Sequence, residues 1–198
     1  GARRLGKKIP LTPEEVEAAT KETKRTVDPS AILLDMGQNL AGFPEITVRG
    51  KRGQKITMVV AEAITDNNAA NQRQTGRQHY YTYTLKGNKN ETWHPRFSYY
   101  GFRYIQVEGA VLKGQKNPDK LPVIQNIQSC FVHNAAADVS TFECSNPIFT
   151  SAHNLIHNAV RSNMQAVFTD CPHREKLGWL EQIHLNGPGL LYNYDLTT

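Results

Sequence analysis

Three observations predict an antiparallel β-sandwich followed by a helical segment. Short runs rich in β-branched and aromatic residues recur from residue 31 to residue 134, with turn residues between them. After Asp138 the apolar residues recur at helical spacing instead. The 198 residues, 39% of them hydrophobic, are enough to build a packed core. We therefore expect residues 31–137 to form the sandwich and residues 138–198 to begin a helical domain.

Residues 1–30 read as a linker or the end of a preceding domain. Within them, "TPEEVEAATKETK" has threonine, proline and glutamate at the first positions of a helix, which predicts a short polar helix over residues 12–24. The first residue is glycine, and "NYDLTT" at the other end shows no helix stop signal. We expect the chain to be part of a longer polypeptide.

The sandwich strands are predicted from six runs: "AILLD", "EITVRG", "KITMVVAEA", "HYYTYTL", "FRYIQVEG" and "VIQNIQSCFV". Residues 50–53 and the segment "KGNKN" after Leu85 contain the glycine and asparagine typical of tight turns, and each is expected to close a hairpin.

The helical part starts with Asn146 as N-cap and Pro147 at the first helical position. The apolar positions that follow form one stripe: Ile148, Ala152, Leu155, Ile156, Ala159, Val160 and Met164. Pro172 and Gly178 predict a loop after this helix, and a second helix is expected to begin near Leu185 or Gly187. Two helices cannot close a core alone, so the stripe needs partners that this chain lacks.

The predicted loop gathers unusual chemistry in "FTDCPHREKLGWLEQ", residues 168–182. Asp170 and Glu175 supply carboxylates, Arg174 a guanidinium and Trp179 an aromatic face. A sugar site needs this combination: charged groups for the hydroxyls, a flat apolar surface for the ring, and an acid for the leaving oxygen. The alternative is a surface loop in which Arg174 caps a helix and pairs with Asp170 while Trp179 anchors the loop in the core.

Other chemistries fit the residues less well. Cys171, His173 and His184, with Cys144, could bind zinc, although their spacing matches no usual zinc site. A nucleophilic Cys171 with His173 as base lacks a third residue to orient that base. The net charge of +5 comes largely from short basic clusters at the leader and a turn, so we expect no nucleic-acid binding. No run is long and apolar enough to predict membrane insertion.

A family resemblance favours the sugar site. "DCPHREKLGWLEQ" resembles the catalytic-loop signature of the α-L-rhamnosidases of glycoside hydrolase family 78. "DMGQNLAGFPEITVRGKRGQKITMVVAEAI" and "WHPRFSYYGFRYIQVEG" resemble the β-sandwich domain that precedes the catalytic domain in that family. The resemblance runs from about Ala31 to the end of the chain, in the family's order.

This resemblance implies a role for each loop residue. Glu175 matches the general acid, Asp170 and Arg174 match residues that bind the rhamnose hydroxyls, and Trp179 matches the aromatic wall. Many relatives carry a further acid where this chain has Gln182, with Glu181 just before it, and either residue could contribute to the site.

The resemblance also implies a fold and a partner. The helices would begin an (α/α)6 toroid, and the general base of this inverting enzyme would lie in the missing remainder of the polypeptide, so the chain alone should be inactive. The substrate would be a rhamnose-containing glycan or glycoside, with neither a metal nor an organic cofactor, in the periplasm or outside the cell.

A second function remains open on the residues alone. The sandwich could be a non-catalytic carbohydrate-binding or scaffold module whose exposed aromatic rings form a sugar platform, although alternation along the strands would bury most of them. The candidates are Tyr80, Tyr81, Tyr83, Trp93, Tyr99, Tyr100 and Tyr104.

Overall fold

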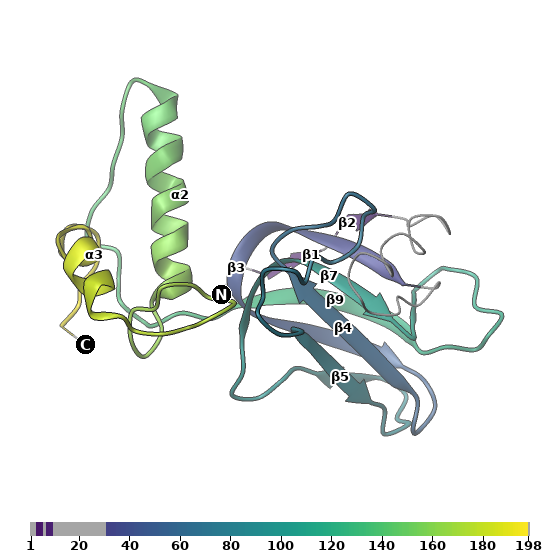
Figure 1. Cartoon of the computed structure of the whole chain (residues 1–198). Helices are drawn as coiled ribbons and strands as arrows, with labels where there is room; N and C mark the ends of the chain where they lie inside the picture. The colour runs from purple at the N-terminus through teal and green to yellow at the C-terminus, as the bar shows by residue number, and fades with distance from the viewer. Residues whose placement is uncertain (1–2, 6, 10–30, 198) are drawn as a thin grey trace. The chain divides into compact units, whose positions relative to one another are not determined.

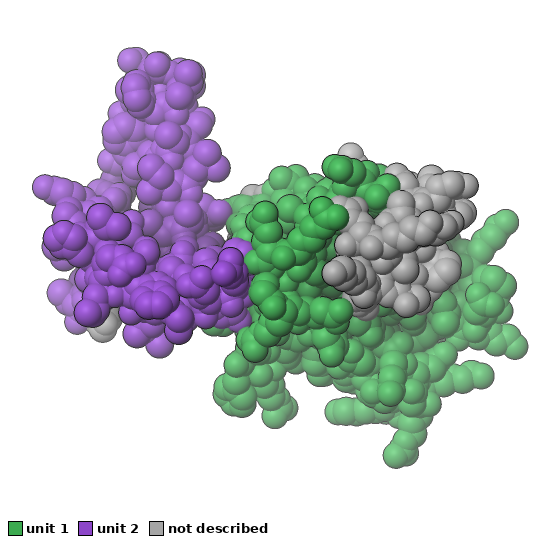
Figure 2. All heavy atoms as spheres, viewed as in Figure 1, with its two compact units in different colours: residues 1–131 green, residues 132–198 purple. Residues whose placement is uncertain are grey.

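A computed structural model of the chain describes residues 3–5, 7–9 and 31–197. The helix expected over residues 12–24 lies outside the described residues. The chain divides into two compact units, residues 1–131 and 132–198, shown in different colours in Figure 2. Each unit is considered by itself below.

The described residues of the first unit form one nine-stranded sheet (Figure 1). Its central path runs β1-β9-β3-β7-β4-β5, with β2 and β6 paired to β3, and β8 paired to β9. Every pairing is antiparallel except β8 with β9, so the sheet is mixed rather than purely antiparallel as expected. The strands are β1 (Arg3–Leu5), β2 (Lys7–Ile9), β3 (Ile32–Arg49), β4 (Lys55–Ala61), β5 (Tyr80–Thr84), β6 (Glu91–Trp93), β7 (Tyr100–Glu108), β8 (Val111–Leu112) and β9 (Val123–Phe131).

The first two predicted runs are joined in one long strand, β3. Its first part pairs with β7 and its second part with β9, and the register with β7 shifts between Asp35 and Leu40. At this bulge Gly37 has a φ of +83°, and its N–H donates to the Asp35 carboxylate at 2.8 Å. Arg103 on β7 binds the same carboxylate through two bonds of 2.8 Å. The bulge lets the strand bend without ending.

The two predicted hairpins are wrong, although the turns exist. β3 and β4 flank the turn at residues 50–54, but β3 pairs with β2, β6, β7 and β9, whereas β4 pairs with β5 and β7. The second turn likewise connects two strands that do not pair with each other: β5 pairs with β4, and β6 pairs with β3. Turn chemistry shows where the chain reverses, whereas strand pairing depends on the core that the strands share.

That core is one hydrophobic cluster to which β3, β4, β5, β7 and β9 all contribute. Phe102, Ile46, Ile56 and Met58 are fully buried within it. Strands from β9 across to β5 share this main cluster, which is consistent with a sandwich.

The second unit contains the predicted helix, α2 (Pro147–Asn163). The Asn146 side chain accepts the Ile148 N–H at 3.0 Å, which confirms the N-cap. Ile148 and Leu155 are each 72% exposed. The apolar stripe is therefore uncovered from Ile148 to Ala159, as expected from its sequence, whereas Met164 at its end is buried. Neither described helix has the length and apolarity needed to cross a membrane.

The last helix, α3 (Leu180–Asn193), begins earlier than predicted. It starts directly after Trp179 and includes Gly187 and Pro188, near which its first turn was expected. Glu181 lies in the first turn, where its negative charge interacts favourably with the positive end of the helix dipole. The unit's small core consists of Ala136, Met164, Leu190 and Tyr194, with Val160 and Phe168 packed against it.

Candidate functional site

The loop between α2 and α3 is fastened at its base to the end of α2. The Thr169 N–H donates to the Asn163 carbonyl at 3.0 Å, and its hydroxyl bonds the Asn163 side chain at 3.0 Å. Thr169 is buried, and Met164 forms a bridge with Phe168. The loop therefore leaves the helix in a fixed direction, confirming the loop predicted here.

Asp170 closes the loop into a ring. Its N–H donates to the Leu177 carbonyl, and its carboxylate accepts the Leu177 N–H, both at 3.0 Å. Just beyond, Gly178 packs on Val167: a Cβ there would lie 3.1 Å from the valine methyl. Lys176 has a φ of +56°, which turns the chain back inside the ring.

This ring brings three of the predicted site residues around Glu175. The Trp179 Nε1–H donates to the Glu175 carboxylate at 3.3 Å, and the Arg174 Nε lies 3.7 Å from its other oxygen. The Asp170 carboxyl also interacts with the Glu175 side chain, and this interaction helps to lower the pKa of Asp170. Glu175 is therefore the centre of a cluster with a carboxylate, a guanidinium and an indole.

The Asp170 carboxyl has a lowered pKa. Its burial opposes the charged form, but the hydrogen bond from the Leu177 N–H and the interaction with the Glu175 side chain outweigh that effect and lower its pKa.

The surface-loop alternative predicted different contacts. Trp179 is 45% exposed rather than anchored in the core, and the ion pair of Arg174 is with Glu175 rather than Asp170. Glu181 and Gln182 lie on the first turn of α3, and the printed bond of Gln182 joins its backbone N–H to the Trp179 carbonyl at 3.1 Å.

The zinc alternative finds no support. Within the described part of the chain, no three His, Cys, Asp or Glu side chains cluster as metal ligands do. Cys130, Cys144 and Cys171 are all free thiols. The Cys171 sulfur accepts the Glu175 N–H at 3.2 Å, which gives the cysteine a structural contact inside the ring.

Sequence reasoning missed a second cluster in this unit. Asp138 holds His157 at 2.9 Å and Arg161 at 2.8 Å, and the Tyr194 hydroxyl donates to the His157 carbonyl at 3.3 Å. Burial opposes ionisation of Asp138, but the bonds from Arg161 and His157 lower its pKa. The spacing of His153, His157 and Arg161 on one helix face was the available signal.

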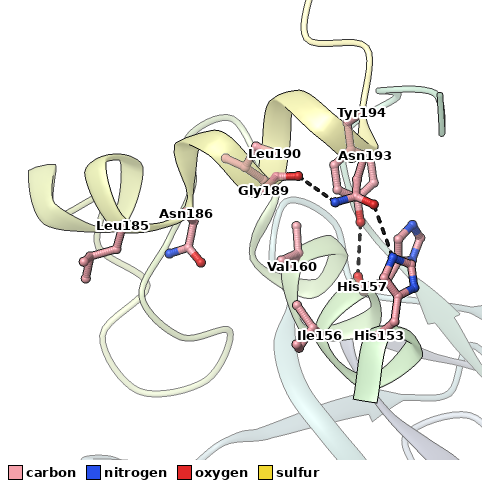
Figure 3. Close-up of a pocket in the computed structure, with 10 residues that line it drawn as sticks. All are labelled: His153, Ile156, His157, Val160, Leu185, Asn186, Gly189, Leu190, Asn193 and Tyr194. Carbon is pink, nitrogen blue, oxygen red and sulfur yellow. Dashed lines mark hydrogen bonds between the residues drawn. The ribbon is translucent and has the colours of Figure 1, made fainter. Parts of the chain in front are cut away.

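A pocket lies beside this cluster, between α2 and α3 (Figure 3). Asn193 points to His153 at 3.3 Å, and apolar side chains such as Ile156 and Val160 line the rest. Its volume is about 140 Å³, well below the roughly 300–1,000 Å³ of small-molecule sites. The cluster fastens α2 to α3, and the pocket is a packing gap.

Two family models match consecutive parts of the chain. Residues 25–133 match the bacterial α-L-rhamnosidase concanavalin-like domain, and residues 137–198 match the 6-hairpin glycosidase domain of the same enzymes. The chain belongs to the bacterial α-L-rhamnosidase family. The two domains follow one another as the resemblance of the sequence implied.

The chain is also similar in sequence to individual members of the family. The chain is 34% identical over 170 residues to an α-L-rhamnosidase of Formosa agariphila and 33% identical over 171 residues to one of Streptomyces avermitilis. These alignments cover 83% and 84% of this chain but 17% and 16% of the relatives. The chain thus spans about a sixth of the length of these relatives.

The structure of the chain is similar to solved structures of α-L-rhamnosidases. The Streptomyces avermitilis α-L-rhamnosidase complexed with L-rhamnose superposes with a TM-score of 0.73 at 28% identity, covering 98% of this chain and 17% of that one. The Aspergillus terreus α-L-rhamnosidase gives a TM-score of 0.78 at 29% identity, with 98% and 20% covered.

Proposed function

We propose that this chain is the part of an α-L-rhamnosidase that carries the general acid, and that the whole polypeptide hydrolyses terminal α-L-rhamnosyl residues with inversion. Family membership supports the activity, and the L-rhamnose complex of a relative supports the sugar. The observation that carries the assignment of the acid is the convergence of Asp170, Arg174 and Trp179 on Glu175.

Glu175 is suited to donate a proton. It is exposed, and the Trp179 N–H and the Arg174 guanidinium contact its two carboxylate oxygens. The exposed part of the indole beside it offers a surface for the sugar ring and its methyl group. Asp170 and Arg174 provide partners for the hydroxyls.

Asp170 is unsuitable as the base of an inverting reaction. Such a base must stand roughly 6.5–9.5 Å from the acid, with a water between them, whereas the Asp170 carboxylate accepts the Leu177 N–H within the loop and interacts directly with the Glu175 side chain. We assign the base to a carboxylate in another part of the polypeptide, on a further helix of an (α/α)6 toroid that α2 and α3 begin. The 198-residue chain alone then releases no rhamnose.

The test is Glu175→Gln in the full-length polypeptide, compared on two substrates. General acid catalysis is worth about 10²–10⁴ in rate when the leaving oxygen is basic, and much less when an activated phenol departs. The variant should lose far more kcat/KM on a natural rhamnoside than on a dinitrophenyl rhamnoside.

Glu181→Gln is the matched control, because it removes a carboxylate from the first turn of α3 six positions along the chain. It should affect both substrates equally and little. Equal losses on both substrates for Glu175→Gln, or a leaving-group-dependent loss for Glu181→Gln, would remove Glu175 from the role of acid.

A further inference from the structure

Three basic turns that are far apart in the sequence meet at one end of the sheet in the first unit. The Gly53 N–H donates to the Leu85 carbonyl at 2.9 Å, and the Gln54 side chain donates to the Lys120 carbonyl at 3.0 Å. A Cβ on Gly87 would lie 2.8 Å from the Arg52 nitrogen. The exposed side chains that these turns carry are Lys51, Arg52, Lys86, Lys89, Asp119 and Lys120.

This group of residues has one acid against five bases. Among the described residues, neither Lys86 nor Lys89 forms an ion pair. A group of positive charges on one part of the surface attracts anions, and this attraction weakens as the salt concentration rises. In the sequence these basic residues lie in separate short segments, and in the fold the turns that carry them are in contact.

A pocket opens beside these turns and shares Lys86 with them. Its volume is about 370 Å³, and it is lined by Tyr83, Lys86, Thr92, Trp93, His94 and Arg96. Such a volume falls within the roughly 300–1,000 Å³ of small-molecule sites. Arg96 is exposed and has no ion-pair partner among the described residues.

The walls of the pocket are rigid and aromatic. Trp93 stacks on Tyr83 with ring centroids 5.1 Å apart, and His94 stacks on Phe43 at 5.2 Å. The Tyr83 hydroxyl donates to Glu91 at 2.6 Å.

Glu91, the carboxylate bonded to Tyr83, is buried and accepts several hydrogen bonds. It also accepts the N–H groups of Lys86, Gly87 and Asn88 at 2.8–3.0 Å. Its charge is therefore satisfied inside the turn, which leaves Lys86 and Arg96 as the charged groups at the surface of the pocket.

We propose that this pocket binds a sugar residue bearing a carboxylate or a sulfate, and that the basic turns hold neighbouring acidic units of the same polysaccharide. Arg96 forms a fork for the anionic group, Lys86 adds a point charge, and Trp93 contacts the ring. The choice of a saccharide rests on the proposed function, which places rhamnose glycans at the other unit. The site would tether an acidic glycan to the enzyme.

Calorimetric titration of the 198-residue chain tests this proposal, since binding is measured without turnover and so independently of the acid assignment. The probes are oligogalacturonate for carboxylates, dextran sulfate for sulfates, neutral dextran, and single-stranded DNA. We expect at least one acidic saccharide to bind, with affinity falling as salt rises, and neutral dextran not to bind.

Arg96→Gln and Lys86→Gln should each weaken binding about tenfold, as expected for a hydrogen bond to a charged group. Arg77→Gln is the control, because it removes the same charge beyond the opposite end of β5. Absence of binding by both acidic saccharides, equal affinity in all three variants, or tighter binding of DNA through the same residues would overturn the proposal.

Discussion

Replacing Trp179 by phenylalanine or by alanine separates two roles of the indole. The Nε1–H donates to the Glu175 carboxylate at 3.3 Å, and Trp179 is 45% exposed. Phenylalanine keeps an aromatic face and removes the donor, whereas alanine removes both. The two variants should therefore change different kinetic constants of the full-length enzyme.

The structure sets the expected sizes. Loss of the N–H bond to a partly exposed carboxylate costs about 0.5–1 kcal/mol, so Trp179→Phe should lower kcat about twofold to fivefold with little change in KM. Covering the exposed part of the indole with a sugar removes on the order of 100 Å² from water, about 2.5 kcal/mol. Trp179→Ala should therefore lower kcat/KM by up to about 60-fold.

Steady-state kinetics on an aryl rhamnoside measures both effects, and circular dichroism checks that the variants are folded. Equal KM increases for phenylalanine and alanine would contradict the division of roles. Unchanged kinetics in both variants would show that the indole takes no part in substrate binding.

Three further predictions concern stability. The pKa of Asp138 in the folded protein lies below its ordinary 3.8. Its contribution to the free energy of unfolding is therefore present above about pH 3.8 and is lost as the pH falls through the folded pKa. Asp138→Asn should remove this acid sensitivity and lower the free energy of unfolding, measured with urea at pH 7, by on the order of 1 kcal/mol. Gly42→Ala would drive a methyl group into the Cys130 carbonyl and should cost about 3 kcal/mol or more, whereas Gly53→Ala, in open space at a φ of +86°, should cost about 1–2 kcal/mol. Asn146→Ala should lower the stability of its helix by about 1 kcal/mol, seen in thermal melts by far-ultraviolet circular dichroism.

The predicted parts of the fold depend on neighbours in the sequence. β-rich runs formed strands, Asn146 capped α2, and the segment with Pro172 and Gly178 formed a loop. Propensity, capping and turn chemistry act over a few residues, so the sequence shows them directly. The composition of the loop also identified the residues that converge on Glu175.

The tertiary structure decided everything that depends on distant partners. β3 became one strand because a bulge fixed by Asp35 and Arg103 let it pair with β7 and then with β9. The basic turns converged because strands from different parts of the chain share one core. Asp138 found His157 only when α2 lay against the end of α3. Pairing across long sequence distances is set by the burial of apolar surface and the satisfaction of buried polar groups, which no local pattern encodes.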